Sequence, residues 1–160
     1  MAETVPIGSE SQQAPDLGRF LEAQAPVLED VMLELRQGHK ATHWMWFVFP
    51  QLAALGRSQM ARYYGLANLE EAQAYLSHPV LGERLKACCQ LVLAHRGKAA
   101  EAMLGSVDAI KLRSCSTLFL QCAGLDSVFG KVLDGFFAGE PDPMTLAVLA
   151  QQAQARQQQV

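Results

Sequence analysis

Four polar side chains recur between residues 107 and 122 at intervals that would place them on one face of a helix. They are Lys111, Ser114, Thr117 and Gln121, separated by three, three and four residues. A lysine beside two hydroxyls and an amide can bind an anion or a sugar. The alternative is an outward face of the helix whose polar groups meet only water.

A second group of candidates lies in the segment HKATHWMWFVFPQ, residues 39–51, which combines two tryptophans and two phenylalanines with a histidine at each end of a short polar run. A short helix of this composition is apolar on every side, and such a helix belongs in a core. We therefore expect Trp46, Phe47 and Phe49 to be core residues.

The ends of the same segment carry polar groups that need hydrogen-bond partners if they are buried. These groups belong to His43, Trp44 and Gln51. We expect these three residues at the margin of a pocket. Helical bundles place ligand sites between helices. The segment would then form the aromatic floor of a cleft, and Lys111 would meet a phosphate or carboxylate across it.

Metal and thiol chemistry have weaker support. The sequence contains no Cys-x-x-Cys pair, and His39 and His43 are four residues apart without a third ligand nearby. We therefore predict no metal site and no cofactor. Cys115 could act as a nucleophile only if a histidine approached it from another segment, and nothing local lowers the pKa of its thiol. We therefore expect reduced, buried cysteines.

Composition narrows the class of protein. Of the 160 residues, 50% are hydrophobic and 18% are charged, which suits one compact domain. The net charge of -3, without a run of basic residues, makes duplex DNA an improbable partner. The longest strongly apolar stretch, 44–49, is far shorter than the roughly 20 residues of a membrane span. The polar, acidic start is not that of a signal peptide, so we expect a cytoplasmic protein without a membrane partner, and the oligomeric state stays open.

The hydrophobic spacing is helical almost throughout the chain. Apolar residues between Val27 and Leu35 repeat at helical intervals before a stop at Gly38, and Asn68 and Asp142 stand where caps begin new helices. These signals predict an all-α, single-domain, irregular orthogonal bundle of about seven or eight short helices. We expect a disordered leader over 1–15, the helical domain over 16–150 and a fraying polar tail over 151–160.

Several strings together resemble a known family. They are DLGRFLEAQAPVLEDVMLELRQGHKATHWMWFVFPQLAALGRSQMARYYGL, AQAYLSHPVLGERL, IKLRSCSTLF and GEPDPMTL. These strings are similar to the bacterial proteins called domain of unknown function 1810, over essentially all of residues 16–149. The resemblance implies a small helical cytosolic protein without an established activity. The label calpastatin, which some members carry, does not suit this chain, because calpastatin-type inhibitors are disordered and polar.

The functional expectation is a small anionic or nucleotide-like ligand bound in the aromatic-floored cleft. Two alternatives remain, and whether the protein is an enzyme stays open. The first is an N-glycosidase acting on ADP-ribose or nucleotide-sugar substrates, because GRFLEAQAPVLEDV and the segment 108–136 faintly resemble helices of the YbiA-like (NADAR) family. The second is a non-enzymatic protein-interaction module that docks a partner on an exposed aromatic patch.

Overall fold

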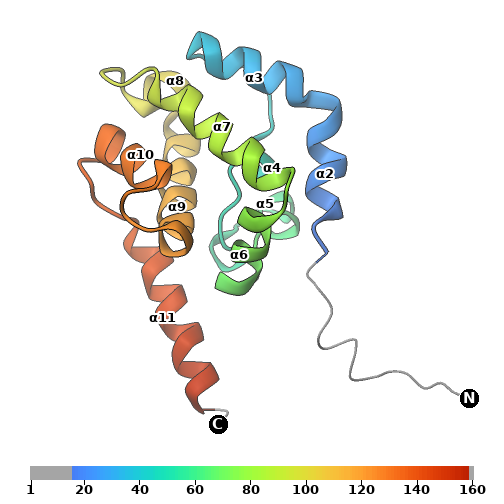
Figure 1. The fold of residues 1–160 in the computed structure, drawn as a ribbon, viewed down its shortest axis with the longest axis vertical. Coiled ribbons are helices and arrows are strands. Elements are labelled where there is room, and N and C mark those ends of the chain that lie inside the picture. Colours follow the sequence, from blue (N-terminus) through green and yellow to red (C-terminus); the bar gives the residue numbers. More distant parts are fainter. Residues whose placement is uncertain (1–15, 159–160) are drawn as a thin grey trace, which may run out of the picture.

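The computed structural model describes residues 16–158, and within them the chain is helical without a β-strand (Figure 1). The predicted all-α class is confirmed. The elements are α2 (Gly18–Gln24), η1 (Ala25–Val27), α3 (Leu28–Gln37), α4 (Met45–Val48), η2 (Ala53–Leu55), α5 (Gln59–Tyr63), α6 (Leu69–Ser77), α7 (Leu81–Leu93), α8 (Ala100–Leu104), α9 (Ser106–Ala123), α10 (Val128–Phe137) and α11 (Pro143–Gln158).

Local signals fix several helix ends. The side chain of Asn68 accepts a hydrogen bond from the backbone N–H of Glu71, and that of Ser58 accepts one from Ala61. Gly38 ends α3 with φ of 69°, a left-handed conformation that glycine adopts without strain. Short helical turns such as α4 and α5 accompany the longer helices and carry the aromatic segment and its neighbour.

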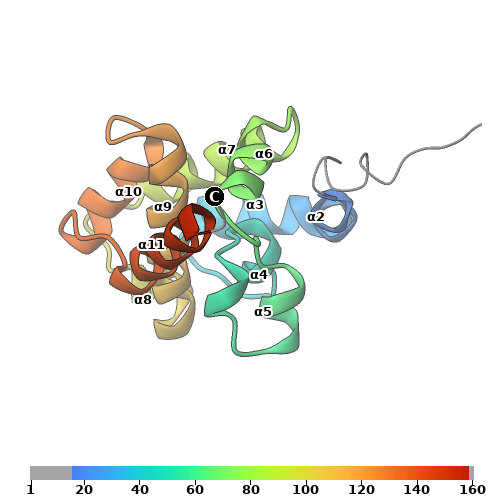
Figure 2. The same ribbon diagram turned by 90° about the horizontal axis from the view of Figure 1, so that it is seen from below.

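Helix α9 is the central element of the bundle. It packs against α6, α8, α10 and α11, which lie around it in Figure 2. Eight of its side chains, between Ala109 and Phe119, are buried. Leu112, Cys115, Leu118 and Phe119 are fully buried, and the ring of Phe119 stacks on that of Phe129 at 5.5 Å between centroids. A helix enclosed in this way can hold polar side chains only where a neighbouring element supplies partners.

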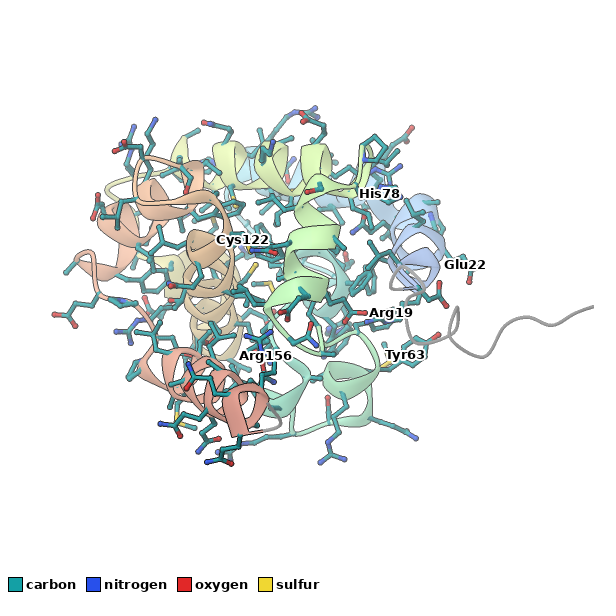
Figure 3. The ribbon with its side chains drawn as sticks, turned by 60° about the horizontal axis from the view of Figure 1, so that its bottom comes forward. Arg19, Glu22, Tyr63, His78, Cys122 and Arg156 are labelled. Carbon is teal, nitrogen blue, oxygen red and sulfur yellow. The ribbon has the colours of Figure 1, made fainter. Side chains whose placement is uncertain are left out.

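The last helix, α11, extends from the end of the bundle that lies opposite α3 and α7 (Figure 1). It is continuous to Gln158, so residues 151–158 are its last turns. The amide of Gln152 donates to the carbonyl of Ala67 at 3.0 Å, and Arg156, labelled in Figure 3, pairs with Glu70. Fraying of these turns stays a prediction, and the expected leader, 1–15, lies outside the described residues.

A short backbone bridge positions the segment between α4 and α5. Leu52 pairs with Leu66: the N–H of Ala53 donates to the carbonyl of Leu66 at 2.8 Å, and the N–H of Leu66 donates to that of Gln51 at 2.9 Å. Between residues 16 and 158 no helix has the length and apolar character of a membrane span.

Candidate functional site

The aromatic segment is arranged differently from the sequence-based prediction. Trp44 is 1% exposed, whereas Trp46 is only partly buried. The expectation that Trp44 stands at a pocket margin and Trp46 in the core is therefore wrong for both residues, whereas Phe47 and Phe49 are core residues as predicted. The physical reason is a buried acceptor: the indole Nε1–H of Trp44 donates to Oε1 of Glu34, so its polar group is satisfied inside the protein.

Glu34 is a buried carboxylate that organises the loop ahead of α4. It accepts hydrogen bonds from the N–H of Ala41 at 2.8 Å, the N–H of Thr42 at 3.1 Å and the hydroxyl of Thr42 at 2.6 Å, in addition to the indole. Burial raises the pKa of Glu34, but the hydrogen bonds from Thr42, Ala41 and Trp44 outweigh it and lower the pKa to about 2. All four donors serve the fold, so this carboxylate is structural.

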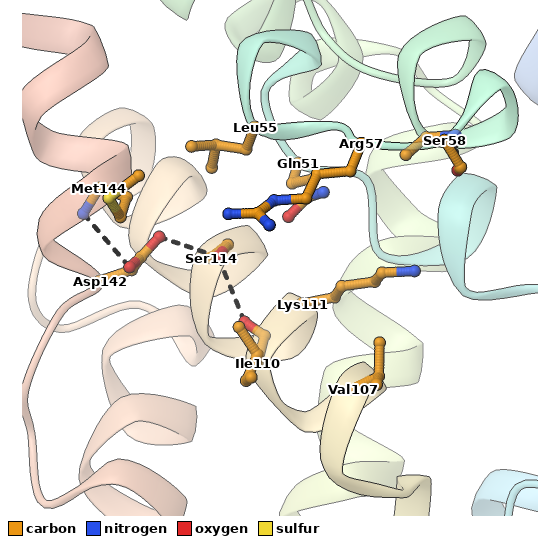
Figure 4. Close-up of a pocket in the computed structure, with 11 residues that line it drawn as sticks. Gln51, Leu55, Arg57, Ser58, Val107, Ile110, Lys111, Ser114, Asp142 and Met144 are labelled. Atoms are coloured by element: carbon orange, nitrogen blue, oxygen red, sulfur yellow. Dashed lines mark hydrogen bonds between the residues drawn. The ribbon is translucent and has the colours of Figure 1, made fainter.

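A pocket of about 460 Å³ lies between the η2–α5 segment, α9 and the start of α11 (Figure 4). Its lining combines polar and apolar side chains from all three elements. The residues are Gln51, Leu55, Arg57, Ser58, Ala61, Val107, Ile110, Lys111, Ser114, Asp142 and Met144.

Two cations from different elements face this pocket. Arg57 comes from the loop between η2 and α5, and its side chain extends into the pocket between Gln51 and Ser114 (Figure 4). Within residues 16–158 no carboxylate lies within 4 Å of its guanidinium. Lys111 comes from α9, with its Nζ 5.5 Å from the ring centroid of Trp46 and 3.8 Å from Asp108. Arg57 therefore has no ion pair within the described residues, whereas Lys111 is paired with Asp108, whose carboxylate lies closer to Lys40, at 2.9 Å.

The opposite wall of the pocket contains one carboxylate, Asp142, directly before α11. Oδ2 accepts from the hydroxyl of Ser114 at 2.9 Å, the hydroxyl of Thr145 at 2.6 Å and the N–H of Thr145 at 3.2 Å. Burial raises the pKa of Asp142, but the hydrogen bonds from Thr145, Ser114 and Met144 more than offset it, and the pKa lies below its usual range. Asp142 is therefore ionised at neutral pH.

The structure brings three of the seven predicted ligand-binding residues to the pocket, namely Gln51, Lys111 and Ser114. Thr117 is buried behind its wall, where its hydroxyl donates to Arg113 and accepts from the N–H of Asp142, each at 2.8 Å. The polar side chains of α9 thus have two roles: Ser114 and Thr117 form hydrogen bonds with Asp142 at the start of α11, and Lys111 and Ser114 line the pocket.

The other predicted residues lie away from the pocket. His43 is exposed on the loop before α4, Gln121 is exposed near the end of α9, and Trp44 is enclosed in the core. Gln121 donates to the carbonyl of Thr117 at 3.2 Å. Arg57 and Asp142 line the pocket but were not among the predicted site residues. The Asp-Pro start of α11 signalled a cap, while nothing adjacent in sequence marks Arg57.

The walls of the pocket are aliphatic. Leu55, Val107, Ile110 and Met144 line it, and none of its described lining residues is aromatic. The expected aromatic floor is therefore wrong for this pocket. From the aromatic segment, Gln51 lines the pocket, and the ring of Trp46 lies under the side chain of Lys111.

Thiols and metal-ligating groups add no second site to the described part of the chain. Cys88, Cys89 and Cys115 are buried and free, and burial raises the pKa of Cys88 to about 12. Thiols of this kind stay protonated and are poor nucleophiles. Between residues 16 and 158 no three His, Cys, Asp or Glu side chains group as a metal site would require.

Comparisons with known proteins agree with this helical architecture. Residues 14–149 match the family described as Protein of unknown function (DUF1810). The structure is similar to the crystal structure of the conserved hypothetical protein Rv1873 from Mycobacterium tuberculosis, with a TM-score of 0.82. The sequences are 48% identical, over 84% of this chain and 96% of that one. A comparison with curated protein sequences finds no match.

Proposed function

The chain belongs to the DUF1810 family, whose description states no activity, and we propose from the pocket itself that the protein binds a small organic anion with an aliphatic body. The observation that carries this proposal is that Arg57 and Lys111 line one pocket. Among the described residues, Arg57 has no carboxylate within 4 Å, and Lys111 has a 3.8 Å contact with Asp108, which Lys40 also engages at 2.9 Å. Guanidinium and ammonium groups are the usual partners of carboxylates and phosphates.

The walls support an aliphatic ligand. Leu55, Val107, Ile110 and Met144 offer apolar surface beside the two cations. Ligand sites commonly combine such walls with a few polar groups that fix orientation. A nucleobase would find no aromatic ring in the lining on which to stack, so the pocket suits an alkyl carboxylate or alkyl phosphate better than a nucleotide.

The polar side chains of the pocket support binding rather than hydrolysis. Glycoside-hydrolysing enzymes generally use two carboxyl groups, one of which is held protonated as an acid. The lining contains one carboxylate, Asp142, and hydrogen bonds keep it ionised. We therefore place the N-glycosidase alternative behind ligand binding.

An interaction module remains the second candidate, and one observation favours it. Val107 and Ile110 are each 65% exposed and Met144 is 60% exposed, so the rim of the pocket is an apolar surface open to solvent. Such a rim could contact a partner protein. A small ligand would cover part of the same surface.

The test is a titration of the ¹⁵N-labelled protein with hexanoate and with hexyl phosphate, followed by amide chemical shifts. We expect shifts confined to residues 51–61, 107–114 and 142–144, with dissociation constants of about 1 to 10 mM for such small probes. Arg57→Met and Lys111→Met should each weaken binding about tenfold, which is the loss of one charge-assisted hydrogen bond.

Lys86→Met is the matched control. Lys86 lies on α7 outside the pocket, with an exposed 3.5 Å contact to Glu83, so this variant removes the same charge elsewhere. Its affinity for both probes should equal that of the unmodified protein. Flat titrations with both probes, or equal weakening in Lys86→Met, would remove the support for an anion site and favour the interaction module.

A further inference from the structure

The two carboxylate oxygens of Asp142 are unequally satisfied. Oδ2 accepts three hydrogen bonds, from Ser114 and from the hydroxyl and N–H of Thr145. Oδ1 accepts one, from the N–H of Met144 at 3.3 Å, which is a long hydrogen bond. A carboxylate oxygen has two lone pairs. Within residues 16–158, Oδ1 therefore retains acceptor capacity.

The unused capacity belongs to a residue that lines the ligand pocket. Asp142 is 9% exposed and is one of the residues that surround the 460 Å³ pocket (Figure 4). A largely buried charge gains most from a partner that also carries charge. Arg57 faces the same pocket without contacting Asp142 within 4 Å, so the described residues supply no such partner.

On the premise of the anion site proposed above, we propose that the ligand is zwitterionic, with an ammonium at the end away from its anion, and that Oδ1 of Asp142 accepts a hydrogen bond from this ammonium. Lys111 and Arg57 hold the anion, and the aliphatic side chains hold the carbon chain between the two charged ends. The ligand class is thus the ω-amino acids and their phosphate analogues.

The spacing along α9 gives a lower limit for the length of such a ligand. Ser114, which holds Asp142, follows Lys111 by three residues, and three residues of α-helix rise about 4.5 Å. The side chain of Lys111 also runs away from Asp142 in the pocket (Figure 4). The ligand therefore needs a chain longer than this rise, and we choose a chain of about five carbons as the probe.

Two ligands that differ in one group test the inference. Hexanoate and ε-aminohexanoate have the same carboxylate and nearly the same length, but only the second carries an ammonium. We expect ε-aminohexanoate to bind the unmodified protein about tenfold more tightly, as one additional charge-assisted hydrogen bond provides. The dissociation constants come from the amide-shift titration described above.

A protein variant and a modified ligand test whether Asp142 causes the preference for ε-aminohexanoate over hexanoate. In Asp142→Asn, which retains a residue suited to begin α11, the ratio of the two affinities should fall to near one. If this variant fails to fold, ε-trimethylammoniohexanoate serves with the unmodified protein. That ligand keeps the positive charge but has no N–H donor, and its affinity should fall toward that of hexanoate.

The outcomes separate this inference from the proposed function. Equal affinities of hexanoate and ε-aminohexanoate for the unmodified protein, with Lys111→Met still weakening both, would overturn the zwitterion inference and leave the anion site standing. A preference that persists in Asp142→Asn would also overturn it. If neither ligand changes the amide chemical shifts, both proposals are overturned.

Discussion

The indole Nε1–H of Trp44 donates a 2.9 Å hydrogen bond to Oε1 of Glu34, which joins the last turns of α3 to the aromatic segment. Glu34→Ala would leave the buried indole donor unpaired and release the backbone of Ala41 and Thr42. We expect a loss of about 2 to 4 kcal/mol in the free energy of unfolding, measured with urea. Glu29→Ala, an exposed change in the first turn of the same helix, should cost less than about 1 kcal/mol. Similar losses in the two variants would show that Glu34 does not organise this loop.

The lowered pKa of Glu34 makes stability depend on acid pH. In the folded protein the pKa of this carboxyl is about 2, against an ordinary value of 4.5. The carboxyl is therefore protonated in the unfolded chain at a higher pH than in the folded protein. This contribution to the free energy of unfolding is present above pH 4.5 and is lost progressively as the pH falls from 4.5 to 2. Urea unfolding across this range should show a shallower decline for Glu34→Gln than for the unmodified protein. Parallel curves would contradict the assignment.

The two tryptophans should differ in their contribution to stability. Trp44 is fully buried and hydrogen-bonded, so Trp44→Ala should cost about 3 to 5 kcal/mol as a large-to-small core substitution. Trp46 is only partly buried, and Trp46→Ala should cost about 2 kcal/mol or less. Thermal unfolding of the two variants checks this order, and the reverse order would mean that Trp46 is the core residue.

Two glycines inside helices should respond in opposite ways to alanine. A Cβ on Gly82, in α7, would lie 2.0 Å from the carbonyl oxygen of Leu76, so Gly82→Ala should destabilise the protein by about 2 kcal/mol or more. A Cβ on Gly135, in α10, would meet only the flexible side chains of Arg96 and Leu93 at 3.1 Å or more. Gly135→Ala should then stabilise by up to about 1 kcal/mol through helix propensity. The melting temperatures of the two variants test this prediction. A higher melting temperature for Gly82→Ala as well as for Gly135→Ala would show that α7 can move away from α6.

The cysteines should differ in reactivity with iodoacetamide. Cys88, Cys89 and Cys115 are at most 1% exposed, and burial raises the pKa of each thiol. Cys122 is partly exposed, although burial still raises its pKa to about 11. Peptide mass spectrometry at pH 8 should therefore find Cys122 modified first, and all four modified together only in urea. Early modification of Cys115 in the folded protein would contradict its burial.

Patterns that act over a few residues predicted most of the architecture. Helical spacing of apolar residues, Asn68 as a cap and Gly38 as a stop depend on neighbours within about one helical turn, and all have the predicted roles. The alignment of Lys111 and Ser114 on one face of α9 has the same origin, and both line the pocket. Periodicity places residues on a face but does not say which partner covers that face.

Only the tertiary structure decided which tryptophan is buried and which residues complete the pocket. Trp44 lies in the core because Glu34, ten residues earlier, accepts a hydrogen bond from its indole N–H. Thr117 is buried because Asp142, directly before α11, packs against it and donates its backbone N–H to the Thr117 hydroxyl. Arg57 lines the same pocket as Lys111 because the Leu52–Leu66 bridge fixes the segment that carries it. A buried polar group needs a partner, and the partner's distance along the chain is set by how the helices pack. The sequence by itself therefore determined the helices and their apolar faces, and packing determined the site.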